Sequence, residues 1–185
     1  MDKIIRGKAF VLGDNVDTDQ IIPAQYLSYD PGDPAERKLF GVYALSGVPA
    51  GASGLPDGDV PFVAEGESAS EFAVIVAGKD FGCCSSREHA PLALAEAGVK
   101  AVVAQSYARI FYRNTINGGY LVPMETPTRL IERIATGDEL EIDVQAARIK
   151  RLRGGEVFDC ADLGDAGQIL AAGGIFEFAK QQGML

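Results

Sequence analysis

Short apolar runs separated by glycine-rich turns predict a mixed α/β fold for this chain. Residues 4–12 are expected to form the first strand. Residues 71–77 and 101–105 are mostly apolar with several β-branched side chains, so each is also expected to form a strand. Apolar residues recur with helical spacing over 107–116, and this helix is expected to end at the glycine pair 118–119. These elements predict the parallel part of a sheet.

The pattern changes in the last third of the chain. A helix is expected over 126–134, with Thr126 as its cap and Pro127 as its first residue. After it, three segments alternate between apolar and polar side chains, as antiparallel strands do, and Gly154 and Gly155 predict a hairpin turn. The three segments are 139–144, 148–152 and 157–160. The parallel and antiparallel parts are expected to share one core, so residues 1–185 are predicted to form a single domain.

Residues 31–70 carry a high density of Pro, Gly and Asp. This composition predicts a long loop, because too little chain precedes it for a separate domain. One short helix over 38–45 is the only regular element expected inside it.

The charge balance narrows the classes of partner. The 185 residues carry a net charge of −9 at pH 7, which argues against nucleic acid and against anionic membranes as partners. The apolar runs are far shorter than the roughly 20 residues of a membrane span, and residues 1–6 lack the pattern of a signal peptide. A cytoplasmic location is therefore expected.

The cysteines predict neither a disulfide framework nor a metal site. Cys83 and Cys84 are adjacent, Cys160 is remote in sequence, and His89 is the only histidine. Adjacent cysteines do not easily bind one metal together, and an iron–sulfur cluster needs more thiolates than this chain supplies. No metal ligand is assigned within the chain.

The densest chemistry lies in residues 78–90, where a glycine-rich turn follows the strand 71–77 and places Ser85, Ser86 and Arg87 together. Hydroxyls and a guanidinium on such a turn are typical of an anion-binding corner. The spacing of Ser85 and Glu88 also fits a capping box that starts a helix. Pro91 favours the alternative that a tight turn precedes a helix, since proline is best tolerated in a first turn.

Three segments in order resemble one family. Residues 82–90 (GCCSSREHA) resemble the G-x-G-S-S-R-E-H-A signature of the swivelling domain of the aconitase superfamily. Residues 15–27 (NVDTDQIIPAQYL) are similar to the N-terminal motif of the separate small subunits of isopropylmalate isomerase and its relatives, and 106–114 (SYARIFYRN) match a third block. The resemblance covers most of the chain and leaves about 32–70 unmatched.

The resemblance implies a fold, a reaction and a partner. The fold would be the three-layer β/β/α swivelling domain with mixed parallel and antiparallel strands. The reaction would be the dehydration and rehydration of a small hydroxy-dicarboxylate by a hydro-lyase of leucine biosynthesis. A [4Fe-4S] cluster would be carried by a large subunit, with which this chain would form a heterodimer or a higher assembly.

The matched positions imply roles for individual residues. Ser85 would be the base, as its alkoxide, and Arg87 would bind a substrate carboxylate as a planar fork. Ser86 would hydrogen-bond the same carboxylate. Asp19, in the Thr18–Asp19 pair of the first motif, would tune the proton relay or hold water near the cluster.

Other polar residues near the motifs have two interpretations each. Lys79, Arg109 and Arg113 either line the substrate entrance or pair with some of the 26 acidic residues. His89 either donates to the site or packs against the first turn of the helix. Thr18 is a further candidate through its place in the motif.

A serine alkoxide requires more than a helix end. The hydroxyl is less acidic than that of Tyr, whose pKa is about 10, and a helix N-terminus contributes at most about 2 kcal/mol. Arg87 and a cluster on the partner would have to supply the rest in a water-poor cleft. The isolated chain is therefore expected to be catalytically silent.

The sequence departs from the family pattern at Cys84, which stands at a usual glycine position. The backbone there must avoid a left-handed conformation or accept strain. Substrate choice is associated with the residues after Tyr26–Leu27, where Ser28 offers no cation for a third carboxylate. An isopropyl or methyl substituent is favoured over the carboxylate of citrate or homocitrate.

Three alternatives stay open. The chain would be the small subunit of a related citraconate-type dehydratase or of a homoaconitase, within the same class. It would otherwise be a stand-alone thiol enzyme that uses Cys83 or Cys84, activated by a helix N-terminus and His89. The third is a module that only binds a carboxylate or phosphate at the Ser85 turn.

Overall fold

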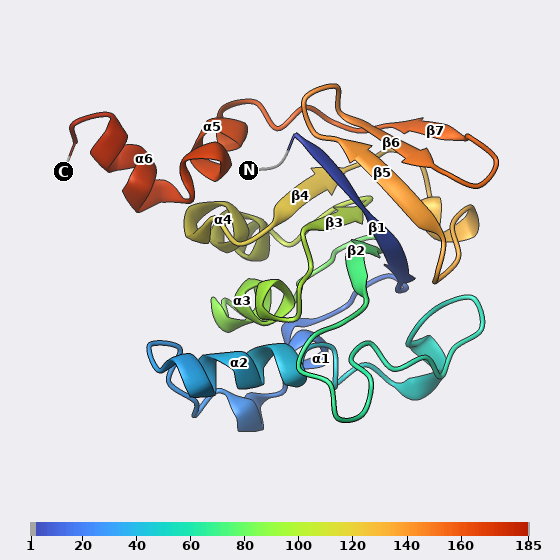
Figure 1. The fold of residues 1–185 in the computed structure, drawn as a ribbon, viewed down its shortest axis with the longest axis horizontal. Coiled ribbons are helices and arrows are strands. Elements are labelled where there is room, and N and C mark those ends of the chain that lie inside the picture. The colour runs from blue at the N-terminus through green and yellow to red at the C-terminus, as the bar shows by residue number, and fades with distance from the viewer. Residues whose placement is uncertain (1–2, 185) are drawn as a thin grey trace.

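The computed structural model describes residues 3–184 and contains one seven-stranded sheet (Figure 1). The strand order is β4-β3-β2-β1-β5-β6-β7. The strands are β1 (Ile4–Val11), β2 (Phe72–Val76), β3 (Ala101–Ala104), β4 (Val122–Glu125), β5 (Glu139–Asp143), β6 (Arg148–Arg151) and β7 (Val157–Asp159).

Strand β1 joins the two parts of the sheet. It pairs in parallel with β2, which continues in parallel through β3 to β4, and it pairs antiparallel with β5, which continues through β6 to β7. The β6–β7 hairpin turns at Gly154 and Gly155, both with positive φ. The mixed sheet predicted from the apolar pattern is confirmed.

Helices cover one face of the parallel strands, and short 3-10 turns connect the elements (Figure 1). The helices are α1 (Thr18–Ile21), α2 (Pro34–Val42), α3 (His89–Glu96), α4 (Arg109–Gly118), α5 (Asp165–Ala172) and α6 (Ile175–Gln181). The 3-10 turns are η1 (Ala24–Tyr26), η2 (Ala50–Ala52) and η3 (Leu130–Glu132). Among the helices of residues 3–184, none combines the length and the hydropathy that crossing a bilayer requires.

Successive side chains of β1 point alternately into two hydrophobic cores. Phe10 packs with the helices on one side, whereas Ala9 and Val11 pack with residues of the antiparallel strands, such as Leu140 and Ile149, on the other. The sheet therefore curls so that its antiparallel half lies against its parallel half, with the helices on the far side (Figure 1). The expected β/β/α layering is confirmed.

The prediction of a helix over 126–134 is wrong. The structure has only the 3-10 turn η3 in this segment, although Leu130 and Ile134 are buried as the spacing required. The Thr126 hydroxyl donates to the Asp159 carbonyl oxygen (3.0 Å) and accepts from the Thr128 N–H (3.2 Å). These bonds tie the segment to β7 and leave room for a single turn.

The region 31–70 is less irregular than its composition suggested. Helix α2 begins at Pro34, four residues before the short helix expected over 38–45. The Asp33 carboxylate accepts hydrogen bonds from the N–H groups of Ala35 and Glu36, and Pro34 is the first helical residue. The Asp-Pro pair is thus a helix start here.

The tail contains two helices that the apolar pattern did not reveal. Helices α5 and α6 bury few side chains, and Leu170 is the buried residue of α5. Because periodicity detects a helix by its buried stripe, a pair with so little burial gives a weak signal.

Candidate active site

The motif segments 15–27 and 82–90 lie side by side. The Gly82 N–H donates to the Val16 carbonyl oxygen (2.8 Å), and the Thr18 N–H donates to the Cys83 carbonyl oxygen (3.1 Å). Asp17 and Cys83 form an isolated parallel bridge. Main-chain bonds therefore fix the start of α1 against the turn that follows β2.

The motif segment 106–114 hydrogen-bonds to the same turn from the other side. The Phe81 N–H donates to the Ser106 carbonyl oxygen (3.1 Å), and the Ala108 N–H donates to the Phe81 carbonyl oxygen (3.0 Å). Gly82 has a φ of +79°, and a Cβ atom at this position would lie 2.2 Å from the Phe111 ring. Glycine is required at 82 by both its backbone and the close approach of α4.

Ser85 is not a helix cap. Helix α3 begins at His89, its N-cap residue Glu88 makes no side-chain cap bond, and Pro91 falls in the first turn. The capping-box interpretation is wrong, and the alternative of a turn before the helix is confirmed. The Ser85 Oγ atom lies 2.7 Å from the Thr18 Oγ1 atom, and Thr18 is buried.

Arg87 reaches back to the segment of α1. Its Nη1 atom donates to Asp19 Oδ1 (2.5 Å) and to the Ile22 carbonyl oxygen (3.4 Å). The hydrogen bond from Arg87 holds the pKa of the Asp19 carboxyl below its usual value. A guanidinium has five N–H donors in a planar fork, so Arg87 can keep this anchor and bind a second carboxylate.

A cavity of about 930 Å³ opens beside Ser85. Helix α4 supplies Arg109 and Arg113, which are one turn apart and exposed on its wall. The Asn114 side chain donates to the Ser86 carbonyl oxygen (3.4 Å), which links α4 to the turn. The lining residues are Cys84, Ser85, Ser86, Ala108, Arg109, Ile110 and Arg113.

The other candidates do not line this cavity, and Arg87, Asp19 and Thr18 are among them. Lys79 is exposed, and its N–H donates to Asp14 Oδ1 (2.8 Å). The His89 ring packs against Phe40 with centroids 5.4 Å apart. Ser28 is exposed in the turn after η1.

Cys84 adopts the strained conformation that its position implied. Its φ is +77°, and its Sγ atom lies 3.4 Å from that of Cys83. Burial, and secondarily the neighbouring Cys84 thiol, raises the pKa of the Cys83 thiol to about 11. Within residues 3–184, no three side chains of His, Cys, Asp or Glu are grouped so that they could hold a metal ion.

Arg109, Arg113 and Asn114 are the residues that motif reasoning left unassigned or missed. All three lie in or next to the third motif, 106–114, and that match was the available signal. The side of α4 that faces Ser85 follows from packing, which the linear sequence does not display.

Comparison with known proteins defines the class first. Residues 51–129 match the family model of the aconitase C-terminal domain. A crystal structure of 3-isopropylmalate dehydratase (leuD) from Methanocaldococcus jannaschii superimposes with a TM-score of 0.76, at 37% identity, over 98% of this chain and 96% of that chain. The fold is that of the aconitase-type swivelling domain.

Curated relatives then define the family. The 3-isopropylmalate dehydratase small subunit 1 of Arabidopsis thaliana is 42% identical over 99% of this chain and 71% of its own length. The isopropylmalate/citramalate isomerase small subunit of Methanocaldococcus jannaschii is 42% identical over 98% of this chain and 97% of its own length. This chain belongs to the family of 3-isopropylmalate dehydratase small subunits. The alignments include the stretch 32–70, so the expectation that it is unmatched is wrong.

Proposed function

We propose that this chain is the small subunit of an isopropylmalate isomerase of leucine biosynthesis, which interconverts 2-isopropylmalate and 3-isopropylmalate with a large subunit. The observation that carries the proposal is the pairing of Ser85 with buried Thr18 at the cavity that Arg109 and Arg113 line. This arrangement places a proton-transfer group, Ser85, beside the cations Arg109 and Arg113, as the isomerisation of a hydroxy-dicarboxylate requires.

Ser85 takes the carbon-bound proton in this proposal. Thr18 is 2.7 Å away and buried, so its hydroxyl can donate to the Ser85 oxygen as negative charge develops there. Because Ser85 precedes α3 by four residues, the helix dipole contributes little. The positive charges of Arg109 and Arg113, which line the same cavity, favour the ionised serine instead.

Arg87 and Ser86 bind a substrate carboxylate in this proposal. Asp19 and the Ile22 carbonyl hold the guanidinium in place before substrate arrives, which lowers the entropy lost on binding. Ser86 is exposed on the cavity and offers a hydroxyl donor.

The residues of this chain do not fit an iron–sulfur cluster. Cys83 and Cys84 are neighbours on the turn, whereas Cys160 follows β7 in the antiparallel layer, so they do not surround a common point. The proposal therefore assigns a [4Fe-4S] cluster to the large subunit.

The relatives' names support two substrates within this class. The Methanocaldococcus jannaschii relative is named for both isopropylmalate and citramalate. Ser28 lies outside the lining of the cavity beside Ser85, so the preference for an isopropyl or methyl substituent over a third carboxylate rests on the family motif and on the relatives' names. A citraconate-type dehydratase is the second candidate. The raised pKa of Cys83 argues against Cys83 as the nucleophile of a thiol enzyme, since such a nucleophile needs a lowered pKa.

The test is reconstitution. The purified chain should be inactive toward 2-isopropylmalate and citramalate, and hydro-lyase activity should appear when a large subunit with a reconstituted cluster is added. Ser85→Ala should lower kcat by about 100-fold or more with little change in substrate affinity, because it removes a proton-transfer group.

Two results would contradict the proposal. Turnover by the isolated chain would disprove a site shared between subunits. Wild-type kcat in Ser85→Ala would leave the turn as a binding module only.

A further inference from the structure

Two thiols lie side by side directly before Ser85. The Cys84 Sγ atom is 3.4 Å from the Cys83 Sγ atom, and the Cys84 thiol donates the hydrogen bond between them. Both are free, Cys84 is exposed on the cavity wall, and Cys83 is half-buried. The sulfur atoms are thus in non-bonded contact, and that of Cys84 is open to a small reagent from the cavity.

The main chain holds one cysteine firmly and strains the other. The Cys83 N–H donates to the Val16 carbonyl oxygen (3.3 Å), and the Cys83 carbonyl oxygen accepts from the Thr18 N–H (3.1 Å). Cys84 has a φ of +77°, which L residues adopt only at a cost. A rearrangement of the pair would therefore move Cys84 rather than Cys83.

We propose that Cys83 and Cys84 are a redox-active dithiol that peroxide oxidises to a disulfide, which disables Ser85. The Cys84 thiolate attacks hydrogen peroxide, forming a sulfenic acid, and the hydroxide that leaves takes up the thiol proton as water. The Cys83 sulfur then attacks the Cys84 sulfur, the S–O bond breaks, and a second water leaves. The two thiols lose two electrons and two protons in total, and the peroxide is reduced to water.

The surroundings assign the two roles. Cys84 is exposed, so it meets the oxidant first. Burial and the neighbouring thiol raise the pKa of Cys83 to about 11, so Cys83 is a poor first attacker. Its position 3.4 Å from the other sulfur makes it an efficient second one, because the attack is intramolecular.

The disulfide should be easy to reduce. Neighbouring Cα atoms are about 3.8 Å apart, below the usual range of about 4.4–6.8 Å across a disulfide. A strained and exposed disulfide has a high reduction potential. Oxidation is therefore reversible by a dithiol reductant.

Closure of the disulfide affects Ser85 directly. The sulfur atoms must approach from 3.4 Å to about 2.05 Å. Since Cys83 is anchored, Cys84 moves and carries Ser85 away from Thr18 Oγ1, which lies 2.7 Å from Ser85 Oγ in the reduced chain. This consequence rests on the proposed function, and a displacement of about 1 Å at a catalytic group costs on the order of 100-fold in rate.

The experiment oxidises the purified full chain alone with hydrogen peroxide, removes the peroxide, and then adds an untreated large subunit. The cluster of the large subunit never meets the oxidant. The expected results are a mass lower by two hydrogen atoms, a Cys83–Cys84 link within one peptide, and an activity about 100-fold lower that dithiothreitol restores.

Matched variants isolate the pair. In Cys84→Ser the ratio of oxidised to reduced activity should stay near one, and the mass loss should disappear. In Cys83→Ser the Cys84 sulfenic acid has no second thiol to attack it, so the chain should gain one oxygen atom instead of losing two hydrogen atoms. Cys160→Ser, which removes a thiol in the antiparallel layer, should respond to peroxide as the wild type does.

Several outcomes would overturn the proposal. They are a peroxide-treated chain without the internal link, a link between two chains instead, a link without loss of activity, or equal inactivation of Cys84→Ser. If the reduced wild-type chain gave no activity with the large subunit, the proposed function would fail, while the mass and the peptide link would still decide whether the dithiol exists.

Discussion

Arg87 is held at two points before any substrate arrives. Asp19 accepts one hydrogen bond, and the Ile22 carbonyl oxygen accepts another, both from the Nη1 atom. The Arg87 side chain is 21% exposed, whereas that of Asp19 is 61% exposed. The guanidinium is therefore positioned by the protein, while the carboxylate that balances its charge is mostly in water.

Replacing the guanidinium by an ammonium should weaken substrate binding. In Arg87→Lys the charge is kept, but a point charge cannot form two parallel hydrogen bonds to a carboxylate. We expect KM to rise about tenfold to 100-fold, since a charge-assisted hydrogen bond contributes roughly 1.5–3 kcal/mol. The measurement is steady-state kinetics of the assembled enzyme.

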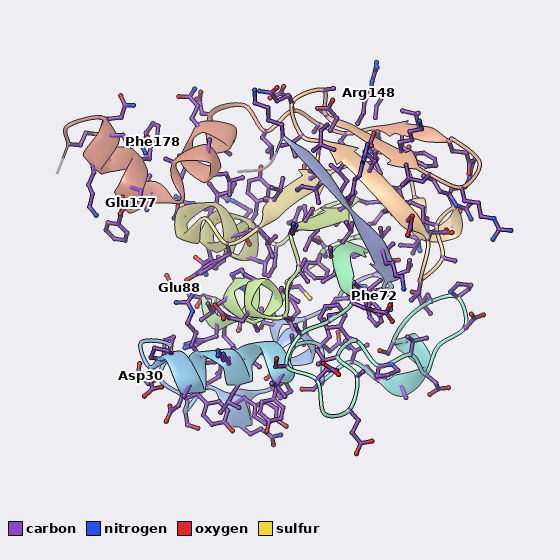
Figure 2. The ribbon with its side chains drawn as sticks, viewed as in Figure 1. Asp30, Phe72, Glu88, Arg148, Glu177 and Phe178 are labelled. Carbon is purple, nitrogen blue, oxygen red and sulfur yellow. The ribbon has the colours of Figure 1, made fainter. Side chains whose placement is uncertain are left out.

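The control is Arg148→Lys on β6. Arg148 is exposed in the antiparallel layer and lies on a different side of the molecule from Glu88, which directly precedes α3 (Figure 2). Its substitution should leave KM unchanged. Equal KM values for Arg87→Lys and wild type would place Arg87 outside the substrate site.

The ion pair between Arg87 and Asp19 is expected to persist at physiological pH. Arg87 lowers the pKa of Asp19, so the carboxylate stays ionised above its unfolded pKa of about 3.9. Its stabilising effect is complete above that pH and is lost only as the pH falls through the lowered folded-state pKa. A change of activity between about pH 5 and 8 must therefore come from other groups.

Motif residues could be predicted to lie together, but their contacts could not. Three ordered segments of the sequence are enough to single out Ser85 and Arg87. The spacing of Ser85 and Glu88 fits a helix cap equally well. Only the folded position of Thr18, which comes from another segment, shows that the Ser85 hydroxyl bonds to Thr18. Side-chain contacts between distant segments depend on packing.

At the scale of elements, helix α2 crosses α3 at a glycine. A Cβ atom on Gly41 would lie 2.7 Å from the Glu96 carbonyl carbon and 2.9 Å from the Ala97 nitrogen. These are main-chain atoms of the end of α3, so they cannot rotate away. The ion pair between Arg37 and Glu96 (2.6 Å) joins the same two helices.

The substitution Gly41→Ala should push the two helices apart. Alanine favours a helix by up to about 1 kcal/mol over glycine, whereas overpacking costs roughly 1–3 kcal/mol, so the clash should win. We expect the free energy of unfolding to fall by about 1–2 kcal/mol, measured by urea denaturation.

A second glycine, outside the contact between α2 and α3, provides the control. A Cβ atom on Gly51, in η2, would have no heavy atom within 4 Å. Gly51→Ala should change the free energy of unfolding by less than about 0.5 kcal/mol. If both variants were equally stable, the helices would not be in contact at Gly41.

Elements with a buried stripe or a strong turn signal could be predicted, and the others could not. Strands β2 and β3 and the second half of β1 are buried and apolar, and Gly119 ends α4 in a left-handed conformation as its sequence indicated. The start of helix α2 could not be predicted, because a pair such as Asp33–Pro34 is as typical of a loop as of a helix cap. Helix α6 has no buried residue among those described, so its sequence carries no stripe.

At the scale of the whole molecule, the charge distribution opposes the net charge. The chain carries −9, which repels a dicarboxylate substrate, yet Arg109 and Arg113 are exposed at the cavity. Charges beyond about 8 Å are largely screened at physiological salt. The local arginines should therefore decide how a dianion approaches Ser85.

Removing one of these charges tests this idea. In Arg113→Gln the side chain stays polar but is shorter and loses its charge. We expect kcat/KM to fall about fivefold at low ionic strength, since a charge pair near a surface contributes roughly 1–4 kcal/mol at contact and less at a distance. Part of the fall should reside in KM, because Arg113 attracts the substrate, and part in kcat, because its charge also favours the ionised form of Ser85. Higher salt should reduce the difference between the variant and the wild type.

Lys150→Gln is the matched control for net charge. Lys150 is exposed on β6, in the layer that packs on the opposite face of the parallel strands from the helices. Both variants bring the chain to the same net charge, so a general electrostatic effect would change them equally. We expect Lys150→Gln to keep the wild-type kcat/KM at every salt concentration. Equal losses in the two variants would show that net charge governs substrate approach, and a salt-independent loss in Arg113→Gln alone would assign Arg113 a direct contact with the substrate.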